Sequence, residues 1–182
     1  MDANKLLSRH GAGEKDFSGA ILHQANLKNT DLSGINLCAA DLSGADLSGA
    51  KLRGCNLSRA NLTDADLSGA DLSGANLSEI NLIGAELINA KLERANLQKA
   101  DLRSANLVNA NMHEANLTEA ELSGADLTKA NLNYANLSNS NINEADICNV
   151  DLTKSNITNQ DINQTQHPTG IPHRWVSWAG SH

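Results

Sequence analysis

Aromatic residues, proline and cysteine are all scarce in this sequence. Aromatic residues make up 2% of its 182 residues, and it has only 2 Pro and 3 Cys. Its apolar residues are almost all Ala and Leu, which predicts a thin core that is too narrow to enclose a ligand pocket. The three cysteines predict no disulfide, which suits a reducing compartment. We expect Cys55 to be a small core residue, and Cys38 and Cys148 to be exposed on different faces.

Long apolar runs and a surplus of positive charge are also missing. No apolar run approaches the roughly 18 residues that a membrane span requires. The first seven residues lack the apolar stretch of a signal peptide. The net charge of −7 argues against direct nucleic-acid binding. We therefore expect a cytoplasmic protein that contacts neither membrane nor nucleic acid.

Motifs for catalysis and metal binding are absent as well. None of the six histidines forms a recognisable metal spacing with a cysteine or another histidine. The glycines recur at period five instead of clustering before a helix, so there is no phosphate loop. Carboxylates are numerous, but a repeat places them regularly, which makes them poor evidence for acid–base catalysis. We predict no enzyme, and no catalytic, cofactor-binding or metal-ligating residues.

What the sequence does contain is a five-residue repeat. It runs from Lys15 to Gln164 without insertion or deletion, which gives thirty copies. We call the large apolar position of each copy i; it begins at Phe17, ends at Ile162 and is Leu in 24 copies. Position i−2 is Ala in 21 copies, and position i−1 is Asn or Asp in 25. Gly and Asn are frequent at i+2.

Period five fits neither an α-helix nor a straight strand. On a helix, successive Leu residues would scatter around the axis, and on a strand they would alternate between faces. A chain that turns a corner every five residues avoids both problems. Ala and Leu then face inward, Asn or Asp faces water, and i+1 with i+2 form the corner. Gly and Asn suit the positive φ at the third position of a type II turn.

A spacing of 20 residues predicts how many corners complete one circuit. Every fourth copy has Asn at i−1 over seven consecutive occurrences, at Asn36, Asn56, Asn76, Asn96, Asn116, Asn136 and Asn156. Twenty residues per circuit give four sides. We therefore predict an all-β solenoid of square cross-section with about 7.5 coils. The stacked Asn amides should hydrogen-bond along the axis as a ladder.

The pattern A-[D/N]-L-[S/T/x]-[G/x], in which x is any residue, resembles the pentapeptide repeat family, and the resemblance covers residues 15–164. It implies a right-handed quadrilateral β-helix. The chain is similar to the small stand-alone members that are abundant in cyanobacteria. Some members of the family protect DNA gyrase from quinolones by mimicking DNA. The resemblance brings no catalytic residues.

Segments outside the repeat should close the two ends. We predict a capping helix within residues 1–14, spanning 2–10, with Asp2 as its N-cap and Gly11 as its stop. Leu6 and Leu7 would cover the first coil; a partner-binding helix is the alternative. Residues 165–182, with Trp175 and Trp178, would form a C-terminal cap or a flexible tail, or a dimer contact. The protein would be a monomer or a dimer held by this tail.

Each side of the coil is named here by its first residue i, as the Phe17, Leu22, Leu27 and Leu32 faces. Net charge is −5 on the Leu22 face and −3 on the Leu27 face, whereas the Leu32 face is balanced. The candidate acidic interaction face comprises Asp46, Asp66, Glu86, Asp126, Asp146, Asp41, Asp64, Asp101, Glu121 and Glu144. Acidic columns also promote solubility, which is the simpler interpretation.

These observations leave two functional hypotheses. The first is a non-enzymatic scaffold that binds an unidentified protein partner through its flat faces. The alternative is a DNA mimic that binds DNA gyrase or another topoisomerase. A rod of 7.5 coils would be about 36 Å long, and duplex DNA of that length carries roughly 21 negative charges. The two acidic faces together carry less than half of that charge, which favours the scaffold.

Overall fold

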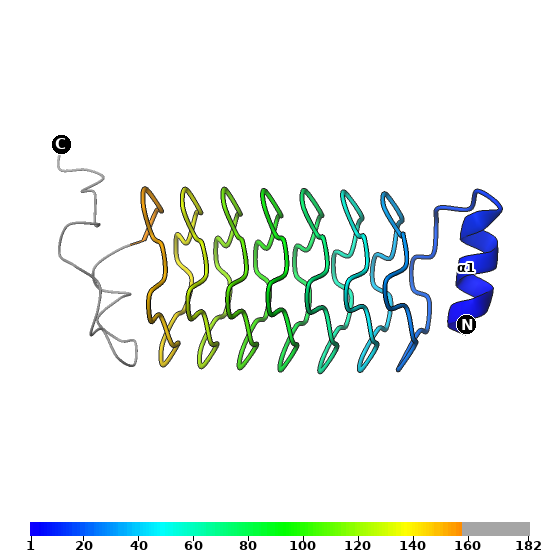
Figure 1. The fold of residues 1–182 in the computed structure, drawn as a ribbon, viewed down its shortest axis with the longest axis horizontal. Coiled ribbons are helices and arrows are strands. Elements are labelled where there is room, and N and C mark those ends of the chain that lie inside the picture. The colour runs from blue at the N-terminus through cyan, green and yellow to red at the C-terminus, as the bar shows by residue number, and fades with distance from the viewer. Residues whose placement is uncertain (158–182) are drawn as a thin grey trace.

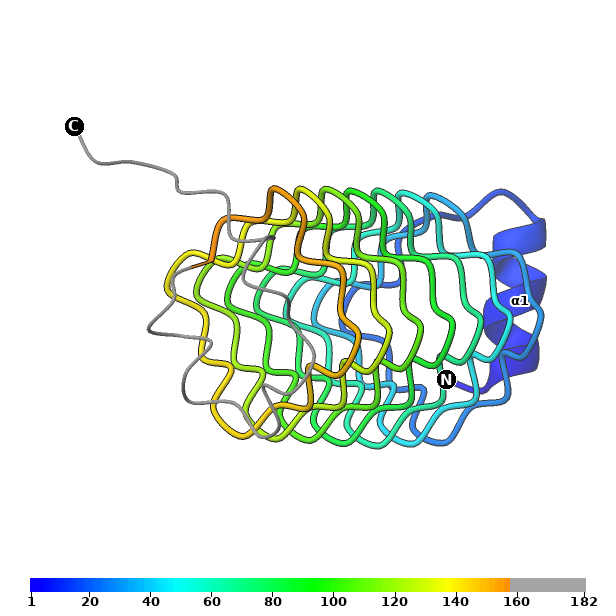
Figure 2. The ribbon, with the colours of Figure 1, turned by 60° about the vertical axis from the view of Figure 1, so that its left-hand side comes forward.

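The computed structural model describes residues 1–157, which form helix α1 (Ala3–Gly11) and a stack of regular coils behind it (Figure 1). The last part of the repeat and the predicted C-terminal segment, with Trp175 and Trp178, lie outside the described residues. The turned view in Figure 2 looks partly along the stack and shows the coils following one another in register.

Single-residue parallel bridges join the coils in place of longer strands. Every bridge pairs two i−1 residues that are 20 positions apart, from Asp16↔Asn36 to Asn136↔Asn156. Each circuit therefore contains four five-residue sides, as the sequence predicts. The bridges stack residues of the same kind of position above one another, so each face of the rod is a set of straight columns.

Backbone hydrogen bonds hold each coil to the next, and the copy 75–79 illustrates the pattern. The N–H of Asn76 donates to the preceding coil at 2.9 Å, while those of Leu77 and Glu79 donate to the following coil at 2.7 and 2.9 Å. The N–H of Ala75 closes the preceding corner at 3.0 Å. Four of the five N–H groups in a copy thus reach a carbonyl, as buried backbone requires. The fifth, at i+1, depends on a side chain.

The core is a narrow column of the residues at i and i−2. Leu97 and Ala95 illustrate it, with 0% and 1% of their surfaces exposed. Burying one Leu fully stabilises a fold by about 1.5–3 kcal/mol, and this core repeats that contribution in every copy. Cys55 occupies an Ala position and is buried as predicted, and desolvation raises the pKa of its thiol to about 12. Cys38 and Cys148 are half-buried rather than exposed, because side chains at i+1 lie along the face between coils.

Every described corner has a positive φ at i+2. Gly occupies some of these positions, but Glu79, Lys99 and Tyr134 adopt the same conformation, with φ of 58°, 58° and 60°. Such residues ordinarily avoid this region. Here the axial hydrogen bond of the i+2 N–H and the closed turn hold the backbone in place. The identity of the side chain therefore matters less at the corner than the sequence prediction assumed.

Helix α1 lies across the first coil (Figure 1). It begins and ends one residue later than predicted, and the Asp2 side chain caps it by accepting the N–H of Lys5 at 2.7 Å. Leu6 is fully buried in the same cluster as the Leu residues of the coils, and Leu7 packs against that cluster while only partly buried. The amino group of Met1 donates to the carbonyl of Ile21 at 2.8 Å. With nine residues, α1 is too short to cross a membrane, and residues 1–157 contain no other candidate span.

Candidate interaction faces

The seven asparagines of the predicted ladder stand in one column on the Phe17 face. From Asn56 to Asn116, each Nδ2 donates to the Oδ1 one coil before it, at 3.0–3.2 Å. The column starts on a carboxylate, since Asn36 donates to Asp16 at 2.8 Å. Asn136 instead donates to the Thr118 hydroxyl at 3.0 Å, and that hydroxyl donates to Asn116. Thr118 thus bridges the one gap in the column of amides. Beyond it, Asn156 Nδ2 donates to Asn136 Oδ1 at 3.2 Å.

The side chain at i−1 also completes the backbone. Every Asn or Asp at this position between residues 16 and 151 accepts the N–H of its own residue i+1 through Oδ1, at 2.9–3.3 Å. This is the Asx-turn bond that favours Asn and Asp in turns. The role was not predicted from the sequence, although the abundance of Asn and Asp before the corner was its signal. In the described residues the bond is missing only where another residue type stands at i−1, at Ile21, Lys51, Glu86, Lys91 and Glu121.

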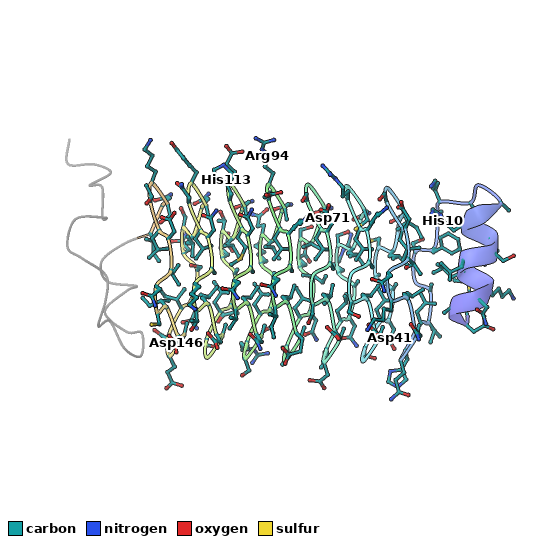
Figure 3. All side chains as sticks on the ribbon, in the orientation of Figure 1. His10, Asp41, Asp71, Arg94, His113 and Asp146 are labelled. Carbon is teal, nitrogen blue, oxygen red and sulfur yellow. The ribbon has the colours of Figure 1, made fainter. Side chains whose placement is uncertain are left out.

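The predicted acidic residues lie on two adjacent faces and on the edge between them. On the Leu27 face, five of them share one column: Asp46, Asp66, Glu86, Asp126 and Asp146. Asn106 occupies the place between Glu86 and Asp126 in this column. On the Leu22 face, Asp41, Asp101 and Glu121 share another column. Asp64 and Glu144 are corner residues between the two faces. Figure 3 places Asp41 and Asp146 along one edge of the rod, away from Arg94 and His113 on the other.

Hydrogen bonds within the repeat hold several of these carboxylates in the ionised form. The hydroxyl of Ser43 donates to Asp41 at 2.7 Å, and together with the Ser43 N–H it lowers the pKa of Asp41. The hydroxyl and N–H of Ser48 lower the pKa of Asp46 in the same way. A depressed pKa in the folded state contributes stability that is present above the unfolded pKa and is lost as the pH falls. These carboxylates are therefore both structural and charged.

Ion pairs are distributed unevenly over the faces. On the Leu32 face, Lys51 lies 3.6 Å from Asp31, and Arg94 lies 2.5 Å from Glu114, whose pKa it lowers. On the two acidic faces, the only ion pair within residues 1–157 joins Arg103 to Asp101 at 2.6 Å. The acidic column of the Leu27 face has no ion pair in this part of the chain. Within residues 1–157, its carboxylates are therefore not neutralised by a paired cation.

Metal-ligating side chains do not converge in the part of the chain that the structure describes. Residues 1–157 contain no group of three or more His, Cys, Asp or Glu placed to hold an ion. His113 instead packs edge-on against Tyr134, with 5.7 Å between the ring centroids. The described faces thus consist of columns of charged and hydrogen-bonding groups.

Four-sided coils that display columns of like residues define the class of this protein as a β-solenoid repeat protein. A family model described as pentapeptide repeats (8 copies) matches the chain four times, at residues 20–59, 60–98, 95–133 and 130–165. The chain therefore belongs to the pentapeptide repeat family. Membership implies a right-handed quadrilateral β-helix, which agrees with the 20-residue circuit.

Several solved structures are similar to this chain. A trypsin-treated form of QnrB1, a plasmid-mediated fluoroquinolone resistance protein, has a TM-score of 0.54 and 23% identity over 83% of this chain and 86% of that chain. HetL, involved in heterocyst differentiation regulation in the cyanobacterium Nostoc sp. strain PCC 7120, is 29% identical over 85% and 94% of the chains, with a TM-score of 0.37. Rfr23 of the cyanobacterium Cyanothece 51142 is 32% identical over 81% and 97%, with a TM-score of 0.32. A comparison with curated proteins found no match.

Proposed function

We propose that this protein is a non-enzymatic scaffold that binds a protein partner through its Leu22 and Leu27 faces. One observation carries the proposal: the carboxylates of the Leu27 column have no ion pair within the described residues, whereas three of the five on the Leu32 face are paired with Lys or Arg. A surface that keeps its negative charge unpaired attracts a positively charged partner and steers its approach. Membership of a family of repeat proteins with flat, regular faces supports this class of function.

The unpaired charge has a cost that the repeat could have avoided. Asp46 and Asp66 are bridged neighbours in the same column. Two unit charges about 4.8 Å apart repel by roughly 1 kcal/mol even in bulk water. Asn would keep the Oδ1 acceptor that the backbone needs, as the Phe17 face demonstrates. The fold therefore does not require aspartate instead of asparagine at these positions. Partner binding or solubility is the remaining reason for the charge.

The proposal is tested by comparing three baits in a host extract. The first is the native chain, the second carries Asp46→Asn, Asp66→Asn and Asp126→Asn, and the third carries Asp31→Asn and Asp71→Asn on the Leu32 face. All three retain the Oδ1 acceptors and should fold. A protein that is retained by the first and third baits but lost from the second supports the proposal. Equal retention by all three baits contradicts it.

The alternative function is a DNA mimic that binds DNA gyrase or another topoisomerase and inhibits or protects it. It is favoured by the adjacency of the two acidic faces, which places carboxylates on both sides of one edge. QnrB1 is a fluoroquinolone resistance protein, and its likeness to this chain is one of fold. In a low-salt supercoiling assay, a mimic inhibits at micromolar concentration, and charge reversal at Asp46, Asp66 and Asp126 abolishes the inhibition. An assay without inhibition removes this alternative.

Other assignments remain predictions from the sequence. We propose that residues 1–14 act as an N-terminal cap, since Leu6 is buried with the first coils. A cytoplasmic location and a monomeric or tail-dimerised state also stay predictions. The roles of residues 165–182 lie outside the described part of the chain.

A further inference from the structure

Position i+1 carries a large aliphatic side chain at only three places in the described repeat. These are Ile83, Ile88 and Val108. Ile83 and Ile88 belong to one coil, and Val108 belongs to the next, because their copies are joined by the bridges Asn81↔Asp101 and Glu86↔Asn106. Ile83 lies on the Leu22 face, and the other two lie on the Leu27 face. All three therefore fall on the two acidic faces, within two adjacent coils near the middle of the rod.

The core does not explain these side chains. All three are half-buried on the surface of the faces and stand outside the buried cluster of Leu and Ala. Elsewhere a hydroxyl at i+1 often donates to the residue at i−1, as Ser43 does to Asp41 at 2.7 Å. An aliphatic residue gives up that hydrogen bond and exposes apolar surface instead.

The copy that contains Ile88 departs from the pattern twice. Its i−1 residue is Glu86, so the N–H of Ile88 finds no acceptor within residues 1–157. Val108 keeps its backbone bond, because the Asn106 side chain accepts its N–H at 3.2 Å. Glu86 instead accepts a hydrogen bond from Asn106 Nδ2 at 2.8 Å, but no hydrogen bond and no place in the buried cluster accounts for the aliphatic side chains at i+1. A locally broken rule of this kind points to a functional site. Apolar surface set among charged residues is typical of the centre and rim of a protein interface.

We propose that Ile88 and Val108, flanked by Ile83, are the apolar centre of a docking site for a basic amphipathic α-helix of a protein partner. This inference rests on the proposed scaffold function and names the class of partner. Charge complementarity carries the choice of partner: Asp66, Glu86 and Asp126 share the face with the apolar pair and form no ion pair in the described chain. Lys or Arg residues beside an apolar stripe would meet these carboxylates.

The axial repeat favours a helix over an extended strand. Ile88 and Val108 are one coil apart, about 4.8 Å along the axis. Along a helix, residues i and i+3 are separated by about 4.5 Å, and i and i+4 by about 6 Å. Residues on one face of a strand are separated by about 6.7 Å. A helix lying along the rod therefore places apolar side chains over both residues in successive turns.

The test uses the full chain and three synthetic 18-residue helices. One has a Leu stripe flanked by Lys, one has the same stripe flanked by Glu, and one replaces the Leu stripe with Gln and keeps the Lys. Binding at low salt is measured by calorimetry and mapped by amide chemical shifts. The patch variant carries Ile88→Ser and Val108→Ser, which restores the residue type common at i+1. The control variant carries Ser78→Ile and Gln98→Ile, a half-buried pair one coil apart on the Phe17 face.

The proposal expects the Leu/Lys helix to bind, with shifts centred on Ile83, Ile88 and Val108. The patch variant should weaken this binding at least tenfold, and the control variant should leave its affinity and location unchanged. The Glu-flanked helix should not bind. Equal affinity of the patch variant and the native chain overturns the inference, while salt-sensitive binding to the acidic faces still supports the scaffold. No binding of either Lys helix overturns both.

Discussion

Replacing one amide in the Asn column by a carboxylate tests how the column stabilises the rod. Asn96 uses both ends of its amide: Oδ1 accepts from the Gln98 N–H and from Asn116 Nδ2, at 3.3 and 3.0 Å, and Nδ2 donates to Asn76 Oδ1 at 3.2 Å. Asn96→Asp keeps the acceptor and removes the donor. The ionised carboxylate then faces the oxygen of Asn76, which cannot turn away without losing its own bond to Ser78.

The expected cost follows from these contacts. One lost hydrogen bond costs about 0.5–1.5 kcal/mol net, and two acceptors facing one another add to it. We expect Asn96→Asp to lower the free energy of unfolding by about 1–2 kcal/mol at pH 7. Making the same change at Asn76, Asn96 and Asn116 together also creates two carboxylate pairs one coil apart. Each pair repels by roughly 1 kcal/mol, and the three single losses add to this, so the triple variant should lose about 5–8 kcal/mol.

Acid should reverse part of this loss, and the sign can be derived from the contacts. A protonated carboxyl can donate to Asn76 Oδ1, so the folded state raises the pKa of the introduced group above its unfolded value. A raised folded pKa means that the penalty is complete above that pKa and disappears as the pH falls toward the unfolded value near 3.9. The native protein also loses stability in acid, because groups such as Asp41 have lowered pKa values. The quantity to compare is therefore the difference between variant and native chain at each pH.

The reciprocal change supplies the control. Asp66→Asn keeps the acceptor for the Ser68 N–H, which lies at 2.9 Å, and removes repulsion from Asp46 and Glu86. It should stabilise the protein by on the order of 0.5–1 kcal/mol at low salt and by less at high salt. Urea unfolding followed by far-ultraviolet circular dichroism measures both variants at pH 7 and pH 3. The reasoning is refuted if Asn96→Asp is harmless at pH 7, or if its penalty persists unchanged at pH 3.

Three further predictions concern the core, the carboxylates and the corners. Leu97→Ala, at a fully buried position, should cost about 2–5 kcal/mol in urea unfolding, and a cost below 1 kcal/mol would contradict the inward orientation. Ser43→Ala removes the hydroxyl that contributes most to the lowered pKa of Asp41, so carboxyl NMR should find that pKa closer to its ordinary value; an unchanged titration would assign the shift to the backbone N–H alone. At a corner with φ of 56°, Ala39→Gly should be neutral or stabilising by up to about 1 kcal/mol. The adjacent buried Ala40→Gly should cost about 1–2 kcal/mol, and thermal unfolding that ranks the two in the opposite order would contradict the assignment of the corner.

The 20-residue circuit could be predicted from the sequence because the same residue types recur at every fourth copy. The recurrence of Asn every 20 residues, from Asn36 to Asn156, has no cause other than stacking, and the bridges reproduce it. The inward orientation of i and i−2 and the outward orientation of i−1 could be predicted from the same periodicity. The conformation of corners such as Glu79 and Lys99 could not be read in this way, because their intrinsic preferences oppose a positive φ and only the assembled coils impose it.

The candidate site was only partly predictable. The acidic columns follow from the period, so their grouping on two faces could be derived from the residue numbers alone. The sequence does not reveal that Asp41 and Asp46 also accept backbone and hydroxyl hydrogen bonds, because that depends on the angle between a side and its corner. The apolar side chain of Ile88 is also a signal in the sequence, since it departs from the hydroxyl-rich pattern at i+1. Such departures become visible once the columns are aligned.

The corners also determine how the surface of this rod can vary. Arg59, Glu79, Lys99 and Glu119 follow one another up one edge, all exposed and with φ of 58–59°. The backbone conformation at this corner is the same in each coil, so substituting one of these side chains changes the surface chemistry of one coil only. At this edge, the side chains that vary the surface are thereby separate from the buried residues that keep the chain folded. The side chains at i+2 can therefore be substituted one at a time, while the axial spacing between successive coils stays constant.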